Sequence, residues 1–231
     1  MPSFKLSFQT PVGGERNDFR IVLDAGHGGE DGGTTGTGIL EKVLTLDMTW
    51  KVARRLEASG WRVEMTRERD ETVPLWQRVQ QSNYYPNSLF VSIHVNADGR
   101  SARSHGIETF YTRPKEESAR AMVAKRFGLE AAYLDSRSEE FAQVTQDALV
   151  AATGARDRGI ESRAYLVTRQ TAAPSILIEC GFLSNPEEAK KLATRAYRDR
   201  LVEGIVAGVE AFASRTLADP GRGLQGRSEG S

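Results

Sequence analysis

Apolar positions along the chain gather in short runs that are separated by longer polar stretches. The runs are rich in β-branched and aromatic residues, which is typical of buried or half-buried strands. The predicted strands are residues 20–25, 61–67, 89–95, 106–112, 164–169 and 175–180.

A helical spacing of apolar residues separates most of these runs. In segment 40–60 the apolar residues lie three or four positions apart, and Gly60 suits the end of a helix. We expect this helix to begin near Leu40 or Glu41. Its predicted buried face consists of Val43, Leu46, Trp50, Ala53 and Leu56.

Further helices are predicted at 74–83, 116–134, 138–153 and 185–215. The last has Ser184 or Asn185 as its N-cap and Pro186 in its first turn. Strands that alternate with helices favour an α/β fold whose sheet is covered on both faces. We therefore predict one α/β domain with a mostly parallel, mixed six-stranded sheet and helices on both faces.

The two ends of the chain lack such periodicity. Residues 1–18 are polar and broken by Pro and Gly, whereas residues 216–231 are rich in Gly, Ser and Arg. Both compositions are typical of mobile segments. We expect a flexible lead at 1–18, a folded domain at 19–215 and a disordered tail at 216–231.

The composition excludes several function classes. Lys plus Arg and Asp plus Glu are equal at 31 each, so no net charge favours binding to nucleic acid. No apolar run is long enough for a transmembrane segment, and the first residues carry no visible export signal. The single cysteine, Cys180, excludes an internal disulfide and a cysteine-rich zinc site, and we expect it in the core rather than as a nucleophile.

The stretch "IVLDAGHGGEDGG" at 21–33 places one of only three histidines in a glycine-rich segment after a predicted strand. A dinucleotide fingerprint would need a third glycine where Asp31 stands, and no P-loop lysine follows. A nucleotide-binding protein is therefore the weakest interpretation. The glycines can instead let the backbone fold tightly, so that His27 points into a cleft at the end of its strand.

Two other polar residues lie near the ends of apolar strands, namely His94 in "LFVSIHVNA" and Glu179 in "SILIECGF". A zinc hydrolase needs three nitrogen or oxygen ligands, an open position for water and a carboxylate that accepts a proton. His27 and His94 can supply two ligands. Glu41 and Glu179 are then left to share the roles of third ligand and base.

Four segments carry a resemblance to a known family. "DAGHGGEDGG" followed by "LEK", then "SIHVNA", and then "RQTAAPSILIECGFLSNPEEAKKL" resemble the zinc-dependent N-acetylmuramoyl-L-alanine amidases of bacterial cell walls, amidase type 3. The motifs occur in the family's order, and the resemblance extends from about residue 20 to about residue 215.

The resemblance implies a role for each matching residue. His27, Glu41 and His94 would hold one Zn²⁺ per chain, and Glu179 would be the catalytic proton carrier. The implied reaction is hydrolysis of the amide between N-acetylmuramic acid and L-alanine of peptidoglycan stem peptides, during wall remodelling or daughter-cell separation. The implied location is the periplasm, the cell envelope or the medium. We expect that an export signal has been removed from this chain. We also expect the protein to be a monomer that could have an activator protein as a partner.

Other polar and aromatic residues receive weaker predictions. Asn96 shares the strand face of His94 and could contact substrate. Asp24 could hold the second ring nitrogen of His27, as carboxylates beside metal ligands do, and Arg158 could pair with a peptide carboxylate. His105 lies in a polar loop, where we expect no ligand role. The tryptophans are expected in the core: Trp50, Trp61 and Trp76.

The segment 115–135 is where a helix that covers the metal site would be inserted. Some members of the family carry a long inserted helix that covers the zinc, but this stretch is short and mixed in charge. We expect no complete self-blocking helix. Two other functions remain open: a wall-binding module without turnover, which would not need Glu179, and a zinc deacylase that acts on an N-acetyl sugar.

Overall fold

A computed structural model describes residues 19–36, 38–85, 87–112 and 137–218. Its centre is a six-stranded sheet in the order β4-β1-β5-β8-β6-β7. All neighbouring pairs are parallel except β6 and β8. The strands are β1 (Arg20–Ala25), β4 (Arg62–Met65), β5 (Ser88–Asn96), β6 (Ile107–Tyr111), β7 (Asp157–Ser162) and β8 (Ser175–Phe182). The predicted mixed, mostly parallel sheet is confirmed.

One predicted strand was wrong. The apolar stretch 164–169 overlaps a short helix, α5 (Leu166–Gln170), and the sixth strand is the preceding polar segment, β7. β7 is an edge strand whose residues are all exposed or half-exposed. Such a strand carries no buried face and leaves no apolar alternation in the sequence.

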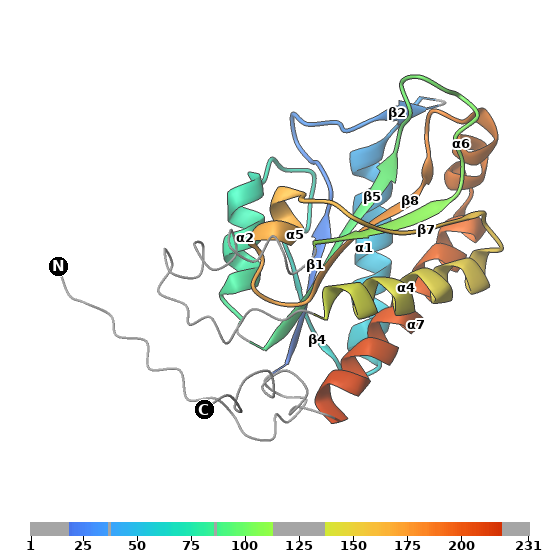
Figure 1. Ribbon diagram of the computed structural model, residues 1–231. Coiled ribbons are helices and arrows are strands. Elements are labelled where there is room, and N and C mark those ends of the chain that lie inside the picture. The colour runs from blue at the N-terminus through green and yellow to red at the C-terminus, as the bar shows by residue number, and fades with distance from the viewer. Residues whose placement is uncertain (1–18, 37, 86, 113–136, 219–231) are drawn as a thin grey trace, which may run out of the picture.

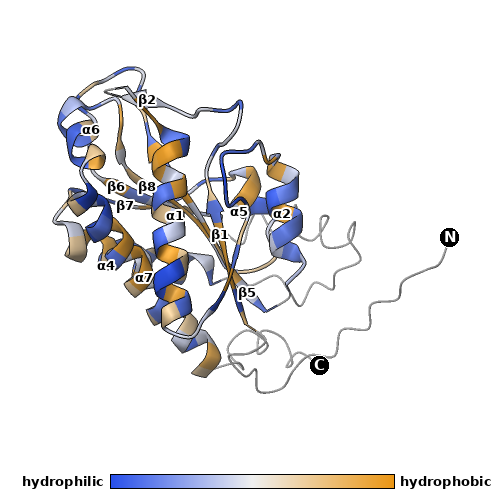
Figure 2. Cartoon of the chain, turned by 180° about the vertical axis from the view of Figure 1, so that it is seen from behind, coloured by the Kyte–Doolittle hydropathy of each residue, from blue (hydrophilic) through white to orange (hydrophobic). Residues whose placement is uncertain are grey.

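Helices cover the two faces unequally (Figure 1). On one face lie α1 (Glu41–Ala58), α4 (Ser138–Thr153) and α7 (Arg195–Ala218), whose apolar residues share the main core. On the other face, α2 (Leu75–Asn83) and α5 enclose a smaller core around Phe90 and Phe110. Figure 2 shows the molecule from the opposite side, with α1 in front of the strands. The remaining elements are a hairpin of β2 (Thr35–Gly36) and β3 (Ile39–Leu40), and α6 (Pro186–Ala193).

Helix α1 begins at Glu41 as expected, but its predicted buried face was partly wrong. Val43 is 55% exposed, and Leu46 and Trp50 are half-exposed. The buried face runs through Leu44, Thr45, Met48, Thr49, Val52, Ala53 and Leu56. Two threonines lie on that face, so counting apolar residues alone placed the stripe about one position away from its true path.

The C-terminal helical segment is two helices rather than one. Asn185 is the N-cap, since its side chain accepts hydrogen bonds from the backbone of Glu187 and Glu188, and Pro186 occupies the first turn as predicted. Thr194 has an extended backbone that separates α6 from α7. Helix α7 then continues to Ala218, three residues beyond the predicted end.

The predictions for single core residues had mixed outcomes. Trp61 is 3% exposed and Cys180 is fully buried, as expected. Trp50 is half-exposed and donates its indole N–H to the carbonyl of Glu68, whereas Trp76 is 62% exposed on α2. The prediction that all three tryptophans lie in the core was therefore wrong for Trp50 and Trp76.

Some predictions lie outside the described residues. These are the flexible lead at 1–18, most of the expected tail, the helix at 116–134 and the question of a self-blocking helix at 115–135. Among the residues that the structure describes, no helix is long and apolar enough to cross a membrane.

Helices α4 and α7 cross so closely that glycine is required at the contact. A Cβ atom on Gly204 would lie 2.7 Å from Cα of Leu149. We expect Gly204→Ala to lower the free energy of unfolding by about 1–2 kcal/mol, because backbone overlap outweighs the gain in helix propensity of about 1 kcal/mol. Urea unfolding followed by circular dichroism measures this change.

The exposed Ala207 on the same helix provides the matched control. Ala207→Gly should report helix propensity alone, with a loss of about 1 kcal/mol. A Gly204→Ala protein more stable than the parent would contradict the close helix crossing.

Candidate metal centre and active site

Three side chains from different elements converge at the carboxyl end of the central strands. His27 follows β1, Glu41 opens α1 and His94 lies near the end of β5. One ligand atom from each lies within 4.8 Å of the other two. These are the residues that the family resemblance implied as metal ligands. His105 lies in the loop between β5 and β6, where Nδ1 is 2.9 Å from the carbonyl oxygen of Arg103, outside the cluster.

The loop after β1 needs unusual backbone geometry to present His27. His27 itself has a left-handed φ of 60°. Gly26 lies beneath the ring of His94, where a Cβ atom would be 2.3 Å from the imidazole, so only glycine fits. Gly28 and Asp31 exchange two backbone hydrogen bonds that close the turn.

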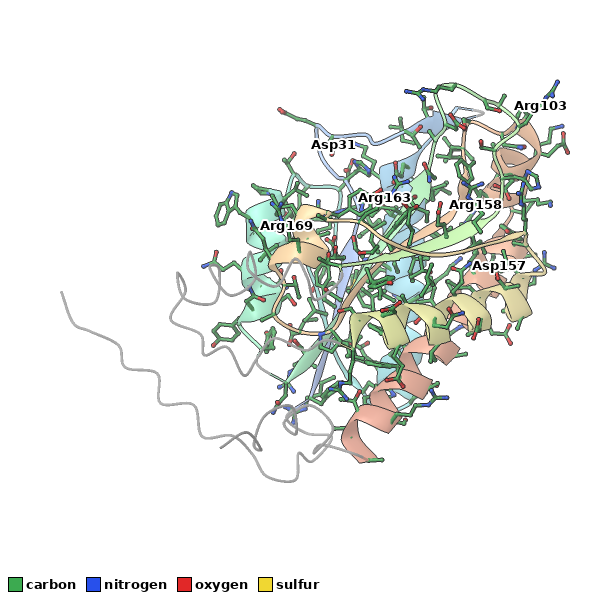
Figure 3. All side chains as sticks on the ribbon, in the orientation of Figure 1. Asp31, Arg103, Asp157, Arg158, Arg163 and Arg169 are labelled. Carbon is green, nitrogen blue, oxygen red and sulfur yellow. The ribbon has the colours of Figure 1, made fainter. Side chains whose placement is uncertain are left out.

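This turn decides which carboxylate holds His27. Nδ1 of His27 lies 2.8 Å from Oδ2 of Asp31, and Figure 3 labels Asp31 on the loop that follows β1. The prediction that Asp24 holds this ring was therefore wrong. Asp24 is buried on β1, where it accepts hydrogen bonds from Thr66, Arg78 and Ser92. The tight turn brings Asp31 back to His27. The glycines on both sides of Asp31 were the sequence feature that could have indicated this turn.

Two buried guanidinium groups support this loop. Arg67 donates to the carbonyls of Ala25 and Gly26 at 2.9 and 2.8 Å and also to the carbonyl of Lys42 in the first turn of α1. Arg78 donates to the carbonyls of Ala25 and His27, both at 2.7 Å. Sequence reasoning missed both residues, because an arginine in a polar segment gives no sign that it will be buried.

Glu41 is the electrostatic centre of the cluster. Its Oε1 lies 3.1 Å from Nε2 of His27 and 3.0 Å from Nδ1 of His94, and it accepts the backbone N–H of Val95. Oε2 accepts the backbone N–H of Thr34. Burial by itself would raise the pKa of Glu41, but the hydrogen bonds with the two histidines hold that pKa far below its ordinary value.

The same contacts act on the histidine. The hydrogen bond with Glu41 raises the pKa of His27, although burial opposes this, and the bond with Asp31 raises it further. Without a metal, a proton on His27 therefore stabilises the cluster. A cation among these groups would displace that proton and satisfy the same carboxylate.

Glu179 lies beside the cluster on β8, in parallel register with His94 of β5. Its Oε2 is buried and accepts no hydrogen bond within the described part of the chain. Burial raises the pKa of Glu179 well above its ordinary value, and the negative charges of Glu41 and Glu108 raise it further. An orphaned buried carboxylate oxygen is costly unless a cation, a donor or a proton completes it.

The donor set fits a zinc ion. Two imidazoles and one carboxylate are typical ligands of catalytic zinc sites, which keep an open position for water or substrate. Asp31 bonds one nitrogen of His27 and leaves Nε2 to face the cluster, as carboxylates commonly do beside metal ligands. The unpartnered Oε2 of Glu179 is available for a proton next to that position.

His27, His94 and Glu179 line a hollow of about 450 Å³ between the sheet, α2 and α5. Its walls combine polar groups of the cluster with apolar side chains such as Leu75, Val167 and Tyr165. This volume suits a small ligand or one end of a longer one.

Arg158 and Asn96 do not line this hollow. Both belong to a second hollow of about 560 Å³, together with Glu108 and Phe182. Nε of Arg158 donates to Oε2 of Glu108 at 3.2 Å. The pairing register with β8 shifts between His94 and Asn96, and Asn96 lines the second hollow rather than the first. Substrate contact by either residue stays a prediction.

The buried pair of Asp24 and Arg78 yields a prediction about pH. Burial by itself would raise the pKa of Asp24, but the charge of Arg78 and the hydrogen bonds from Ser92 and Thr66 hold it below its ordinary value. This stabilisation is present above about pH 4 and is lost as the pH falls through the lowered folded-state pKa. Asp24→Asn should cost about 3 kcal/mol of unfolding free energy at neutral pH.

Urea unfolding of metal-free protein at several pH values measures this difference. It should shrink below about pH 4, where the parent carboxylate also takes up a proton. Asp199→Asn, which removes a surface partner of Lys51, is the control and should change stability little. A loss for Asp24→Asn that is the same at every pH would show that shape, rather than charge, is responsible.

Comparison with known proteins places this geometry in context. Over 204 residues the chain is 32% identical to the N-acetylmuramoyl-L-alanine amidase LytC of Bacillus subtilis, covering 88% of this chain and 36% of LytC. It also resembles the crystal structure of an N-acetylmuramoyl-L-alanine amidase from Clostridium difficile 630, with a TM-score of 0.75, 33% identity and coverage of 86% and 98% of the two chains.

A second similar structure is the CwlD amidase of Clostridioides difficile in complex with the GerS lipoprotein, at 28% identity and a TM-score of 0.72, covering 85% of this chain and 98% of the compared chain. The chain spans about a third to a half of the length of several curated relatives. The N-acetylmuramoyl-L-alanine amidase family matches residues 21–211, and this chain belongs to that family.

Proposed function

We propose that this chain is a zinc-dependent amidase that cleaves the bond between N-acetylmuramic acid and L-alanine in peptidoglycan, with one zinc ion per chain. The observation that carries the proposal is the buried Oε2 of Glu179, which has no partner in the described part of the chain, beside His27, Glu41 and His94. A group of metal-binding side chains with an adjacent proton acceptor is the arrangement that metal-assisted amide hydrolysis requires.

The proposed site has metal-binding residues and one residue that carries a proton. His27, Glu41 and His94 would hold the ion, which when bound supplies Lewis acidity that polarises a carbonyl and makes water more acidic. Glu179 accepts the proton of the attacking water at Oε2 and returns it to the departing amine of L-alanine. Its raised pKa makes this carboxylate a stronger base than an ordinary glutamate, so it takes a proton from water more readily.

Two other functions are less well supported. A wall-binding module would have no use for a buried carboxylate without a partner, since that group costs stability. A deacylase that acts on an N-acetyl sugar could use the same metal and base, but the family relationship favours the muramoyl amide. Product analysis separates these alternatives.

The cellular setting follows from the substrate. Peptidoglycan lies outside the cytoplasmic membrane, so we place the activity in the periplasm, the cell envelope or the medium, in wall remodelling or daughter-cell separation. The structure of CwlD is of its complex with the GerS lipoprotein, which supports an activator protein as a partner for this chain as well. We expect the chain itself to act as a monomer.

Mass spectrometry of purified muropeptides tests the reaction. Zinc-loaded protein should release stem peptides that begin with L-alanine, while chelated protein should release none. Glu179→Ala and the closer mimic Glu179→Gln should lower kcat by about a hundredfold or more, because the proton carrier is lost. Zinc content measured on the same samples should remain one ion per chain.

The outcomes separate the three functions. Intact muropeptides with retained wall binding would favour the binding module, and release of acetate would favour the deacylase. Full activity of Glu179→Gln would remove the proposed role of that carboxylate.

Zinc titration tests the metal centre. Asp31→Asn should weaken zinc binding by about ten- to a hundredfold, since Asp31 orients His27. Affinity should also fall as the pH is lowered, because Glu41 raises the pKa of His27 and zinc must displace that proton. Glu30→Gln, which removes a neighbouring exposed carboxylate, is the control. Equal affinity in the Asp31 and Glu30 variants would contradict the orienting role.

A further inference from the structure

The second hollow, about 560 Å³ in volume, is rich in arginine and is called the arginine hollow below. Arg100 reaches it from the loop after β5, Arg158 from β7, and Arg163 from the segment after β7. Figure 3 labels Arg158 and Arg163 near each other, with Arg103 farther out toward α6. The lining residues are Asn96, Ala97, Asp98, Gly99, Arg100, Glu108, Phe110, Arg158, Arg163 and Phe182.

Strand register places this hollow next to the proposed reaction centre. Glu179 on β8 lies opposite His94 of β5 on one side and opposite Glu108 of β6 on the other. Directly paired residues present their side chains on the same face of a sheet. The metal cluster, Glu179 and the Glu108–Arg158 pair therefore follow one another across a single face.

Aromatic rings hold two of the arginines in place. The guanidinium of Arg158 lies 4.9 Å from the ring centre of Phe182, and that of Arg163 lies 5.1 Å from the ring centre of Phe110. Stacked guanidinium groups lose little further freedom when they bind a ligand, and their planar fork matches a carboxylate. Both arginines are thus prepared for an anion before it arrives.

The carboxylates of the hollow leave donors unused. Among the described residues, Glu108 accepts only Nε of Arg158. Arg163 donates one N–H group at 3.1 Å to Glu161, which lies outside the hollow, and also hydrogen-bonds the side chain of Tyr165. The terminal Nη atoms of Arg158 donate to no residue that the structure describes. Asp98 is occupied by Ser104 and by the backbone N–H of Arg100. Within the part of the chain that the structure describes, several guanidinium N–H groups therefore have no partner and can bind a ligand.

We propose that the arginine hollow binds a carboxylate of the stem peptide while the muramoyl amide lies at the metal cluster. This inference rests on the proposed function and adds a specificity site to it. The glycan part of the substrate carries no charge at the reacting sugar, whereas the peptide carries free carboxylates. Arginines on the face next to Glu179 therefore fit the peptide side, and the partly apolar hollow beside α2 and α5 fits the muramoyl side.

A pair of substrates tests the proposal directly. We would measure kcat/KM for a muramoyl tetrapeptide with free carboxylates and for the same compound with every peptide carboxylate converted to an amide. The parent should prefer the acid form by about tenfold, as expected for a charge-assisted hydrogen bond. In Arg158→Ala and Arg163→Ala the acid-to-amide ratio should fall toward one.

The two variants guard against an indirect effect. Arg158→Ala also leaves Glu108 unpaired, and the free charge of Glu108 would itself disfavour the acid substrate, so the Arg163→Ala variant is the cleaner test of the ratio. Arg163→Ala keeps the Glu108–Arg158 pair intact. Arg103→Ala, which removes an exposed arginine from the loop between β5 and β6, is the matched control and should retain the parent ratio. A parent ratio near one, or an unchanged ratio in both variants, would overturn the proposal.

A binding measurement separates this proposal from the proposed function. Isothermal titration calorimetry would follow the free peptide L-Ala-γ-D-Glu-L-Lys-D-Ala and its fully amidated form, which contain no muramoyl amide. Tighter binding of the acid form by about tenfold, lost in the two variants, would support the carboxylate site even if the parent cleaved nothing. Cleavage by the parent together with equal binding of both peptides would leave the amidase standing and remove the carboxylate site.

Discussion

The end of β1 is the constraint on which the site depends. Where the strand stops, the carbonyls of Ala25, Gly26 and His27 lose sheet partners, and a buried carbonyl without a donor is costly. Arg67 and Arg78 supply the donors from inside the fold. The left-handed backbone of His27 is sustained by these contacts, so a residue bearing a side chain can hold a conformation that favours glycine.

Three acidic side chains lie close together, Glu179 among them. Glu41, Glu179 and Glu108 lie close enough for their charges to influence one another, and burial strengthens the effect. Glu41 is stabilised by two histidines, while one oxygen of Glu179 has no partner among the described residues. The same type of side chain can therefore serve as a ligand at one position and as a proton carrier at the other, because their surroundings differ.

Sequence reasoning succeeded where chemistry and local pattern coincide. Apolar strands ending in His94 and Glu179, and a glycine turn around His27, could be read from the residues themselves, although the separation of the glutamate roles came from family resemblance. The same reasoning failed at β7, a polar edge strand, and at the stripe of α1, where buried threonines replaced apolar residues. In both cases the neighbours, rather than the local pattern, determine burial.

The sequence by itself determined the alternation of strands and helices, the family motifs and the residues able to bind a metal, because each depends on nearby residues or on residue type. Only the tertiary structure decided that Asp31 rather than Asp24 holds His27, and that Arg158 faces a separate hollow beside Glu108. Those contacts depend on chain reversal and strand register, which bring together groups whose pairing no single segment specifies.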